Sequence, residues 1–127
     1  MRRRVQAVVG LQTLLAFSPT ATAVAALRDD RIAALAAIEL GRRGALAAIE
    51  PLVARLEKGE PPAAFEGASA TAAGDALRQI TGGDFDRAEE WRRWWRDAGK
   101  AQAGPEGAPP AEAEVEAAAR ALGIGAR

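Results

Sequence analysis

The chain has 127 residues, which allows one small domain at most. Its 17 basic and 17 acidic residues cancel, which argues against an overall attraction to nucleic acid or to an anionic membrane. The sequence contains no Cys and no His, so disulfides, thiolate nucleophiles and the commonest zinc ligands are excluded. We therefore expect a non-enzymatic protein with no catalytic residues, no metal site and no cofactor.

The first 23 residues have the layout of a secretory signal peptide. Three arginines follow Met1, residues 5–17 are mainly apolar, and Ala21 and Ala23 are small residues of the kind that signal peptidase accepts. The apolar run is shorter than the roughly 20 residues that a membrane-spanning helix needs, so we expect no stable membrane span. Cleavage after Ala23 would make the mature protein periplasmic or secreted.

The same segment also fits a helix that stays in the fold. Val5, Val8, Val9 and Leu15 can form one apolar stripe, with the arginines at its solvated end. In that alternative, residues 1–23 are the first helix of the domain and the protein is cytoplasmic. The sequence leaves both interpretations open.

The next helix is predicted to begin at Asp29 or Asp30. Either carboxylate can accept hydrogen bonds from the free backbone N–H groups of a helix start. Helically spaced apolar residues continue to Leu40, after which Gly41 and Gly44 end the helix.

A second helix is predicted from Leu46 to Lys58. Pro51 lies in its first turn, where the missing N–H of proline costs nothing. The Pro-rich segment 60–67 then breaks the helix.

A third helix is predicted from Ser69 or Thr71 to Ile80. Gly74 lies inside it and costs roughly 1 kcal/mol relative to Ala in a helix. We therefore expect another helix to pack closely at Gly74.

The segment 76–95 carries the strongest local signals. Gly82 and Gly83 end the third helix, and Asp86 with Glu89 resembles a capping box that opens a fourth. The apolar residues of this fourth helix recur at helical spacing and form one face: Trp91, Trp94, Trp95 and Ala98.

We expect the tryptophan rings to pack inside the protein with Phe85, as a cap on the end of the helical domain. The alternative is an exposed face that stacks on nucleic acid or carbohydrate, helped by the neighbouring arginines. Glu89 and Glu90 can pair with those arginines along a solvated face, which favours the buried rings.

The tail has two parts. Residues 101–110 have the composition of a linker, and residues 111–122 predict a short helix that stops at Gly123. Because its apolar face is narrow, we expect this helix to be mobile or weakly docked.

Two features together resemble a known family. The segments ending at Leu40 and Leu77 echo one another at a spacing within the range of paired-helix repeats. The chain then closes with TGGDF and WRRWW. Residues 24–100 are in these respects similar to bacterial HEAT-like (armadillo-type) helical repeat proteins with a Trp-rich closing segment.

The resemblance implies an all-α fold, an α-α superhelix fragment of antiparallel helix pairs. It also implies a non-catalytic scaffold that binds another protein through a helix face. Two repeats are fewer than a stable stack usually needs, so a first helix, the tryptophan cap or a homo-oligomer would have to complete it. Arginines near the predicted helix ends are the candidate partner contacts: Arg31, Arg42, Arg43, Arg55 and Arg78.

Two other functions occur among helical-repeat proteins. Some relatives are lyases or accessory factors for chromophore attachment, but this sequence has no residue set for such chemistry. Others bind nucleic acid inside the cell, which the balanced charge opposes here.

Overall fold

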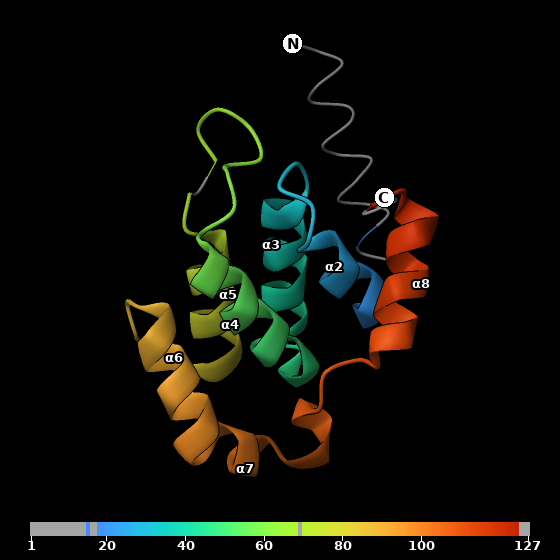
Figure 1. The fold of residues 1–127 in the computed structure, drawn as a ribbon. Helices are drawn as coiled ribbons and strands as arrows, with labels where there is room; N and C mark the ends of the chain where they lie inside the picture. The colour runs from blue at the N-terminus through green and yellow to red at the C-terminus, as the bar shows by residue number, and fades with distance from the viewer. Residues whose placement is uncertain (1–14, 16–17, 69, 125–127) are drawn as a thin grey trace.

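The computed structural model describes residue 15, residues 18–68 and residues 70–124. Every regular element in these ranges is a helix, which confirms the all-α class (Figure 1). The principal helices are α2 (Thr20–Ala26), α3 (Ala33–Arg43), α4 (Ile49–Lys58), α5 (Ala72–Thr81), α6 (Ala88–Trp94), α7 (Lys100–Ala103) and α8 (Glu112–Leu122). Short 3-10 turns at Leu46–Ala48 and Gly104–Gly107 and a π-helical stretch at Trp95–Gly99 join them.

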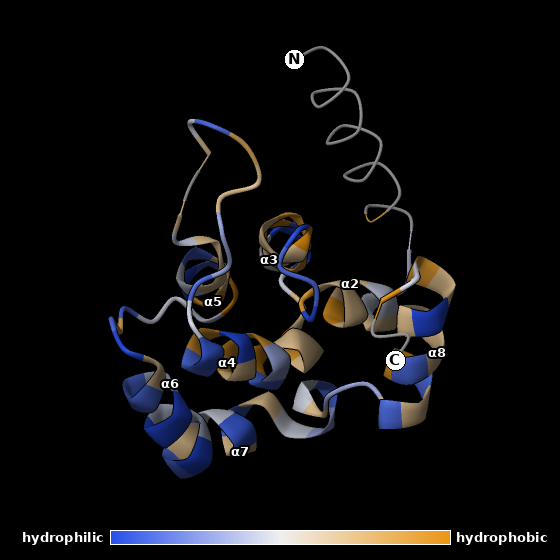
Figure 2. Ribbon diagram, turned by 45° about the horizontal axis from the view of Figure 1, so that its top comes forward, coloured by the Kyte–Doolittle hydropathy of each residue, from blue (hydrophilic) through white to orange (hydrophobic). Residues whose placement is uncertain are grey.

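The helices are arranged around a central pair, α3 and α5, which pack directly on each other. Figure 2 shows α3 and α5 nearly end on, with α2 and α4 lying across them. The α2 helix packs on α3, and α4 packs on α5. At one side α6 packs on α4, and at the other α8 packs on α2 (Figure 1). A superhelical stack of repeats remains a prediction.

The close contact between helices occurs at Gly41. A Cβ atom at this position would lie 2.9 Å from the Cα of Ala76, so the absent side chain lets α3 and α5 approach. Our prediction placed such a contact at Gly74, which instead lies beside the carboxylate of Glu60. Gly41 lies within α3, and Gly44, with φ 63°, ends this helix.

The start of α3 also differs from the prediction. Its first residue is Ala33, and neither Asp29 nor Asp30 caps it. Asp29 accepts hydrogen bonds from the backbone N–H and the guanidinium of Arg31, and Asp30 accepts one from Arg55. Because arginines bind both carboxylates, neither is available to cap the helix.

The predicted boundaries of α4 and α5 agree with the structure to within a few residues. Pro51 lies in the first turn of α4, and Gly82, with φ 75°, ends α5. Of the two predicted starts of α5, Ser69 lies outside the described residues, and Thr71 occupies the N-cap position without capping through its side chain. Glu60 does so instead, accepting hydrogen bonds from the backbone N–H groups of residues 73 and 74.

The tail helix was expected to be mobile or weakly docked, and the structure packs it on α2. Gly123, with φ 76°, ends it as predicted. The interpretation of residues 5–17 lies almost wholly outside the described residues, and the predicted cleavage point after Ala23 falls inside α2. None of the helices in the described part of the chain has the length and apolar content that a membrane crossing requires.

Candidate partner-binding groove

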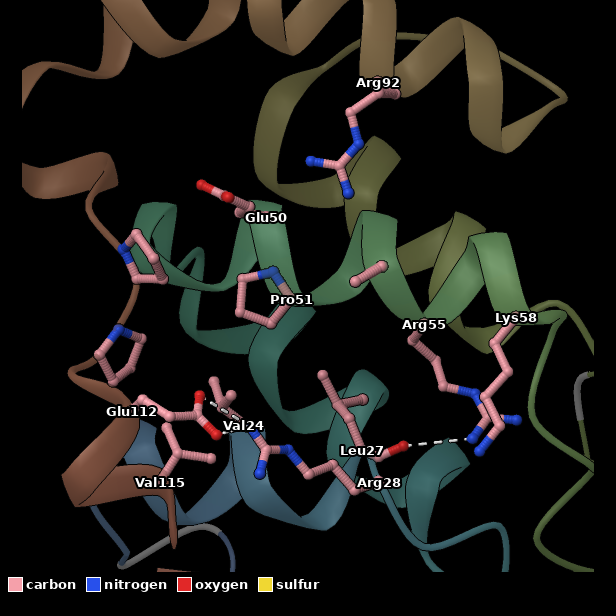
Figure 3. Close-up of a pocket in the computed structure, with 13 residues that line it drawn as sticks. Val24, Leu27, Arg28, Glu50, Pro51, Arg55, Lys58, Arg92, Glu112 and Val115 are labelled. Atoms are coloured by element: carbon pink, nitrogen blue, oxygen red, sulfur yellow. Dashed lines mark hydrogen bonds and ion pairs between the residues drawn. The ribbon is translucent and has the colours of Figure 1, made fainter.

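A groove runs between α2 and α4, and the start of α8 closes one side of it (Figure 3). Its volume is about 520 Å³. We call it the α2–α4 groove. Most of its lining is apolar, from α2, α4 and the segment that leads into α8: Val24, Leu27, Pro51, Ala54, Pro109, Pro110 and Val115.

The sequence places these apolar residues at the groove for local reasons. Pro51 and Ala54 are three residues apart on α4 and therefore lie on the same side of the helix. Leu52 and Val53 point the other way and are fully buried in the core. Ala54 is exposed although it lines the groove, so the groove is open to solvent at this residue.

Charged side chains surround this apolar lining, and most of them are already paired within the protein. Arg28 donates two hydrogen bonds to the Glu112 carboxylate, at 2.8 and 3.0 Å, across the gap between α2 and α8 (Figure 3). Arg92 on α6 donates to Glu57 on α4 at 2.7 Å, and this hydrogen bond raises the pKa of the Arg92 guanidinium. The two pairs hold neighbouring helices in place at the groove rim.

Lys58 is different from these arginines. It is exposed at the end of α4, lines the groove and forms no ion pair within the described residues. Figure 3 shows it beside Arg55. The groove therefore has an available cation at this end.

A second, more polar groove begins on the far side of Arg28 and Lys58. Its volume is about 900 Å³, and it lies between the loop 28–31 and the outer part of α8. Glu116, Ala119, Arg120 and Ile124 contribute its α8 wall. Arg28 and Lys58 thus mark the boundary between the two grooves, and α8 contributes to the wall of each.

Of the five arginines predicted as partner contacts, Arg55 lies in the α2–α4 groove. Its side chain is only 6% exposed, because its guanidinium donates to Asp30 at 2.7 Å and to the carbonyl of Leu27 at 3.3 Å. Arg55 therefore ties α4 to the end of α2 and has little capacity left for a partner. Arg31 lines the second groove and pairs with Asp29.

Arg42 and Arg43 lie at the end of α3, and both bind the buried carboxylate of Glu39. Burial alone raises the pKa of this carboxyl, but the hydrogen bonds from Arg43 and Arg42 outweigh it, and the net shift is downward. Arg43 also donates to the carbonyl of Leu15. This hydrogen bond from Arg43 links the N-terminal part of the described chain to α3.

Arg78 lies at the end of α5 and holds the turn that leads to α6. It pairs with Asp75 and Asp84, and donates to the carbonyl of Phe85 at 3.1 Å. Only one half of the capping box predicted from Asp86 and Glu89 is present, and it is displaced by one residue. The N-cap is Arg87, and its backbone N–H donates to Glu90.

The tryptophans point into the protein. Trp91 and Trp95 are fully or almost fully buried, and Trp94 is half-buried. The Phe85 ring meets the Trp91 ring edge to face, with 4.9 Å between ring centroids. The indole N–H groups of Trp91 and Trp95 have no hydrogen-bond partner within the described residues. The structure thus places these rings at a packed end of the helical layer.

Sequence reasoning did not find the groove as a site. Its residues come from four helices that are distant in the sequence, α2, α4, α6 and α8, and each of its apolar residues alone looks like part of an ordinary apolar face. The one available signal was Lys58, a cation at a predicted helix end without a nearby acidic residue on its own face. The sequence could not show that Lys58 lines a groove, because it did not predict the position of α8.

Comparison with protein-family models, with curated proteins and with solved structures finds no match to this chain. The HEAT-like resemblance therefore stays a prediction. Among the described residues, no group of three or more carboxylates has the geometry to hold a metal ion.

Proposed function

We propose that the chain is a non-catalytic protein-binding module and that the α2–α4 groove receives an apolar segment of its partner. The open apolar lining around Ala54 is the observation that carries this proposal. Peptide recognition in grooves between helices uses apolar side chains as anchors, with a few polar contacts that fix the orientation. The groove has both elements.

At the end of the groove near Lys58, the charge favours a partner segment with a carboxylate near its apolar anchor. Arg28, Arg55 and Arg92 are each neutralised by an acidic residue of the chain itself. Lys58 is the cation that a partner carboxylate can reach without breaking such a pair. A surface ion pair of this kind contributes on the order of 0 to 1 kcal/mol, so the apolar contacts would supply most of the affinity.

On this proposal the partner contacts differ from the arginines that the sequence suggested. Arg55 shapes the groove wall, and Arg43 and Arg78 hold the chain together internally. The residues that would contact a partner are instead Lys58, Pro51 and Ala54.

The HEAT-like architecture, assembly as a homo-oligomer and export after cleavage near Ala23 are further proposals, and they rest on the sequence alone. Export would place the partner outside the cytoplasm. Retention of residues 1–23 would place it inside the cell.

The proposed function can be tested by selecting peptides from a random display library on the full-length protein. We expect the selected peptides to combine apolar residues with an acidic one. Ala54→Trp should fill the groove and abolish their binding, because Ala54 lines it and is exposed. Gln102→Trp is the matched control, since Gln102 is exposed on α7 and lines neither groove. Peptides that bind both variants equally would contradict the proposal.

A further inference from the structure

The tail helix α8 packs on α2 and contributes a wall to each of the two grooves. Glu112 and Val115 line the α2–α4 groove, and Glu116 and Ala119 line the second groove. If α8 moved away, both grooves would lose this wall and would open over Arg28, which lines both of them. The accessible apolar surface at Val24 would then be wider.

The apolar face by which α8 packs on α2 is narrow and made mostly of small side chains. Within the helix Val115 and Ala119 are buried and Ala118 and Leu122 are half-buried, and Ile124 is buried just beyond its end. The Arg28–Glu112 pair links it to α2, and these side chains are 44% and 65% exposed. Within the described part of the chain, no other charged group of α8 forms an ion pair. An exposed pair of this kind is weak and is screened by salt.

The segment that leads into α8 is fixed at Gly107 and extended beyond it. Gly107 is buried against Trp95, where a Cβ atom would lie 2.9 Å from the ring. Beyond it, residues 108–111 include Pro109 and Pro110, and Ala108 and Ala111 are extended. The two prolines keep this arm out of a helix. The helix can therefore leave α2 without disturbing the tryptophan cluster.

We propose that the outer face of α2 is a helix-binding site, that α8 occupies it in cis, and that a partner helix of the same chemistry displaces α8. The contacts of α8 with α2 and Arg28 define that chemistry. Glu112, Val115 and Ala119 follow one another at intervals of three and four residues, so they share one helix face. The partner helix would carry an acidic residue for Arg28, followed by small or β-branched apolar residues at the other two positions.

This inference rests on the proposed function and adds regulation to it, because a partner helix would replace α8 as one wall of the α2–α4 groove. A partner that supplies a longer apolar face than Val115 and Ala119 would compete successfully with α8. Until such a partner is present, α8 protects the apolar surface of α2.

The test uses a fluorescently labelled peptide with the sequence of residues 109–124 and the full-length protein. We expect weak binding to the wild type, whose own α8 occupies the site. Glu112→Arg in the protein should release α8 and tighten peptide binding by about fivefold, the size of effect expected for an exposed ion pair. Glu114→Arg is the matched control, since Glu114 is exposed on the same helix and makes no ion pair within the described residues. It should bind the peptide like the wild type.

A charge reversal at the site gives an independent measurement. Arg28→Glu should bind a peptide that carries Arg at the position of Glu112 more tightly than it binds the native peptide. Because Glu112 is 65% exposed, the Glu112→Arg protein should keep its fold. Amide hydrogen exchange should become faster in residues 112–124 of this variant and stay unchanged in α3 and α4.

Equal peptide binding by the Glu112→Arg and Glu114→Arg proteins would overturn the inference, as would wild-type dimers that exchange α8 between copies. Its failure can be distinguished from failure of the proposed function. If library peptides still depend on Ala54 while the two charge variants behave alike, the groove binds partners and α8 does not regulate it.

Discussion

Gly41 in α3 and Ala76 in α5 bring two helix backbones together, since a Cβ atom at Gly41 would lie 2.9 Å from the Cα of Ala76. The obstacle is backbone, which cannot rotate away as a flexible side chain can. This contact sets the spacing of the central helix pair, on which α2 and α4 rest.

We therefore predict that Gly41→Ala destabilises the protein by about 1 to 3 kcal/mol through overpacking, despite the higher helix propensity of Ala. Urea denaturation measures the effect. Gly74→Ala is the control, because the nearest neighbour there is the Glu60 carboxylate at 3.1 Å, which can shift. We expect the control to be close to neutral. An equally tolerated Gly41→Ala would show that α3 and α5 are not held at this distance.

Glu60 caps α5 from the preceding loop, and its loss should weaken the helix. The carboxylate accepts hydrogen bonds from the N–H groups of Ala73 and Gly74, at 2.8 and 3.0 Å. Glu60→Ala leaves both groups without this acceptor, and we expect a loss of about 1 kcal/mol in the free energy of unfolding. Glu66→Ala, an exposed change in the same loop, should have little effect. Similar losses for the two variants would argue against the cap.

Glu39 predicts a pH dependence of stability. The pKa of its carboxyl is lower in the folded protein than in the unfolded chain, where it is about 4.3. Its ion pairs with Arg42 and Arg43 therefore stabilise the fold fully above about pH 5. This contribution is lost as the pH falls through the ordinary value towards the folded pKa. The hydrogen bond from Arg31 lowers the pKa of Asp29, which acts in the same direction.

We expect Glu39→Gln to reduce the free energy of unfolding by about 2 kcal/mol at neutral pH and to flatten its decline in acid. Thermal unfolding followed from pH 7 to pH 3 checks both effects. Glu66→Gln serves as the exposed control. If the two variants lose stability in parallel with the wild type as the pH falls, the Glu39 pairs do not contribute as described.

The predicted cleavage point makes a further prediction about stability. Ala21 and Ala23 are buried in α2, so removal of residues 1–23 would take away the first half of that helix, two buried methyl groups and the buried side chain of Leu15. We expect a chain of residues 24–127 to melt at a lower temperature than the full chain. Intact mass spectrometry of cellular and exported fractions would show which form exists. A shortened chain of equal stability would show that the first turns of α2 do not support the fold.

The elements that the sequence predicted well are those whose signals are local. Gly44, Gly82 and Gly123 all have positive φ, and each ends a helix as the pattern indicated. Pro51 lies in the first turn of its helix, because a proline N there replaces a group with no partner in the helix. The burial of Trp91 and Trp95 likewise follows the spacing of the apolar residues.

The errors occurred where other side chains compete for the same groups, and in most cases these come from distant parts of the sequence. Asp29 and Asp30 looked like caps, but Arg31 and Arg55 bind them, and Arg55 comes from another helix. Glu60 is 13 residues before the amide that it caps, too far for a local pattern.

Arg92 provides a similar case on the tryptophan helix. It was expected to pair with an acidic residue on its own helix and instead bridges to Glu57 on α4. The sequence pattern alone cannot show whether an arginine pairs with an acidic residue on its own helix or on another helix.

The groove was the least predictable feature, because the position of α8 depends on small apolar side chains and one exposed ion pair. Val115 and Ala119 provide too little apolar surface to indicate where the helix docks. The Arg28–Glu112 pair joins residues 84 positions apart. Only the folded arrangement shows that this tail forms a wall of the groove.

Binding in the α2–α4 groove is tested most directly by amide hydrogen exchange of the full-length protein with and without a selected peptide. We expect the peptide to slow exchange in residues 20–27 and 49–58, which line the groove, and to leave α3 and α5 unchanged. Slower exchange confined to α3 and α5, with α2 and α4 unaffected, would contradict the proposed site.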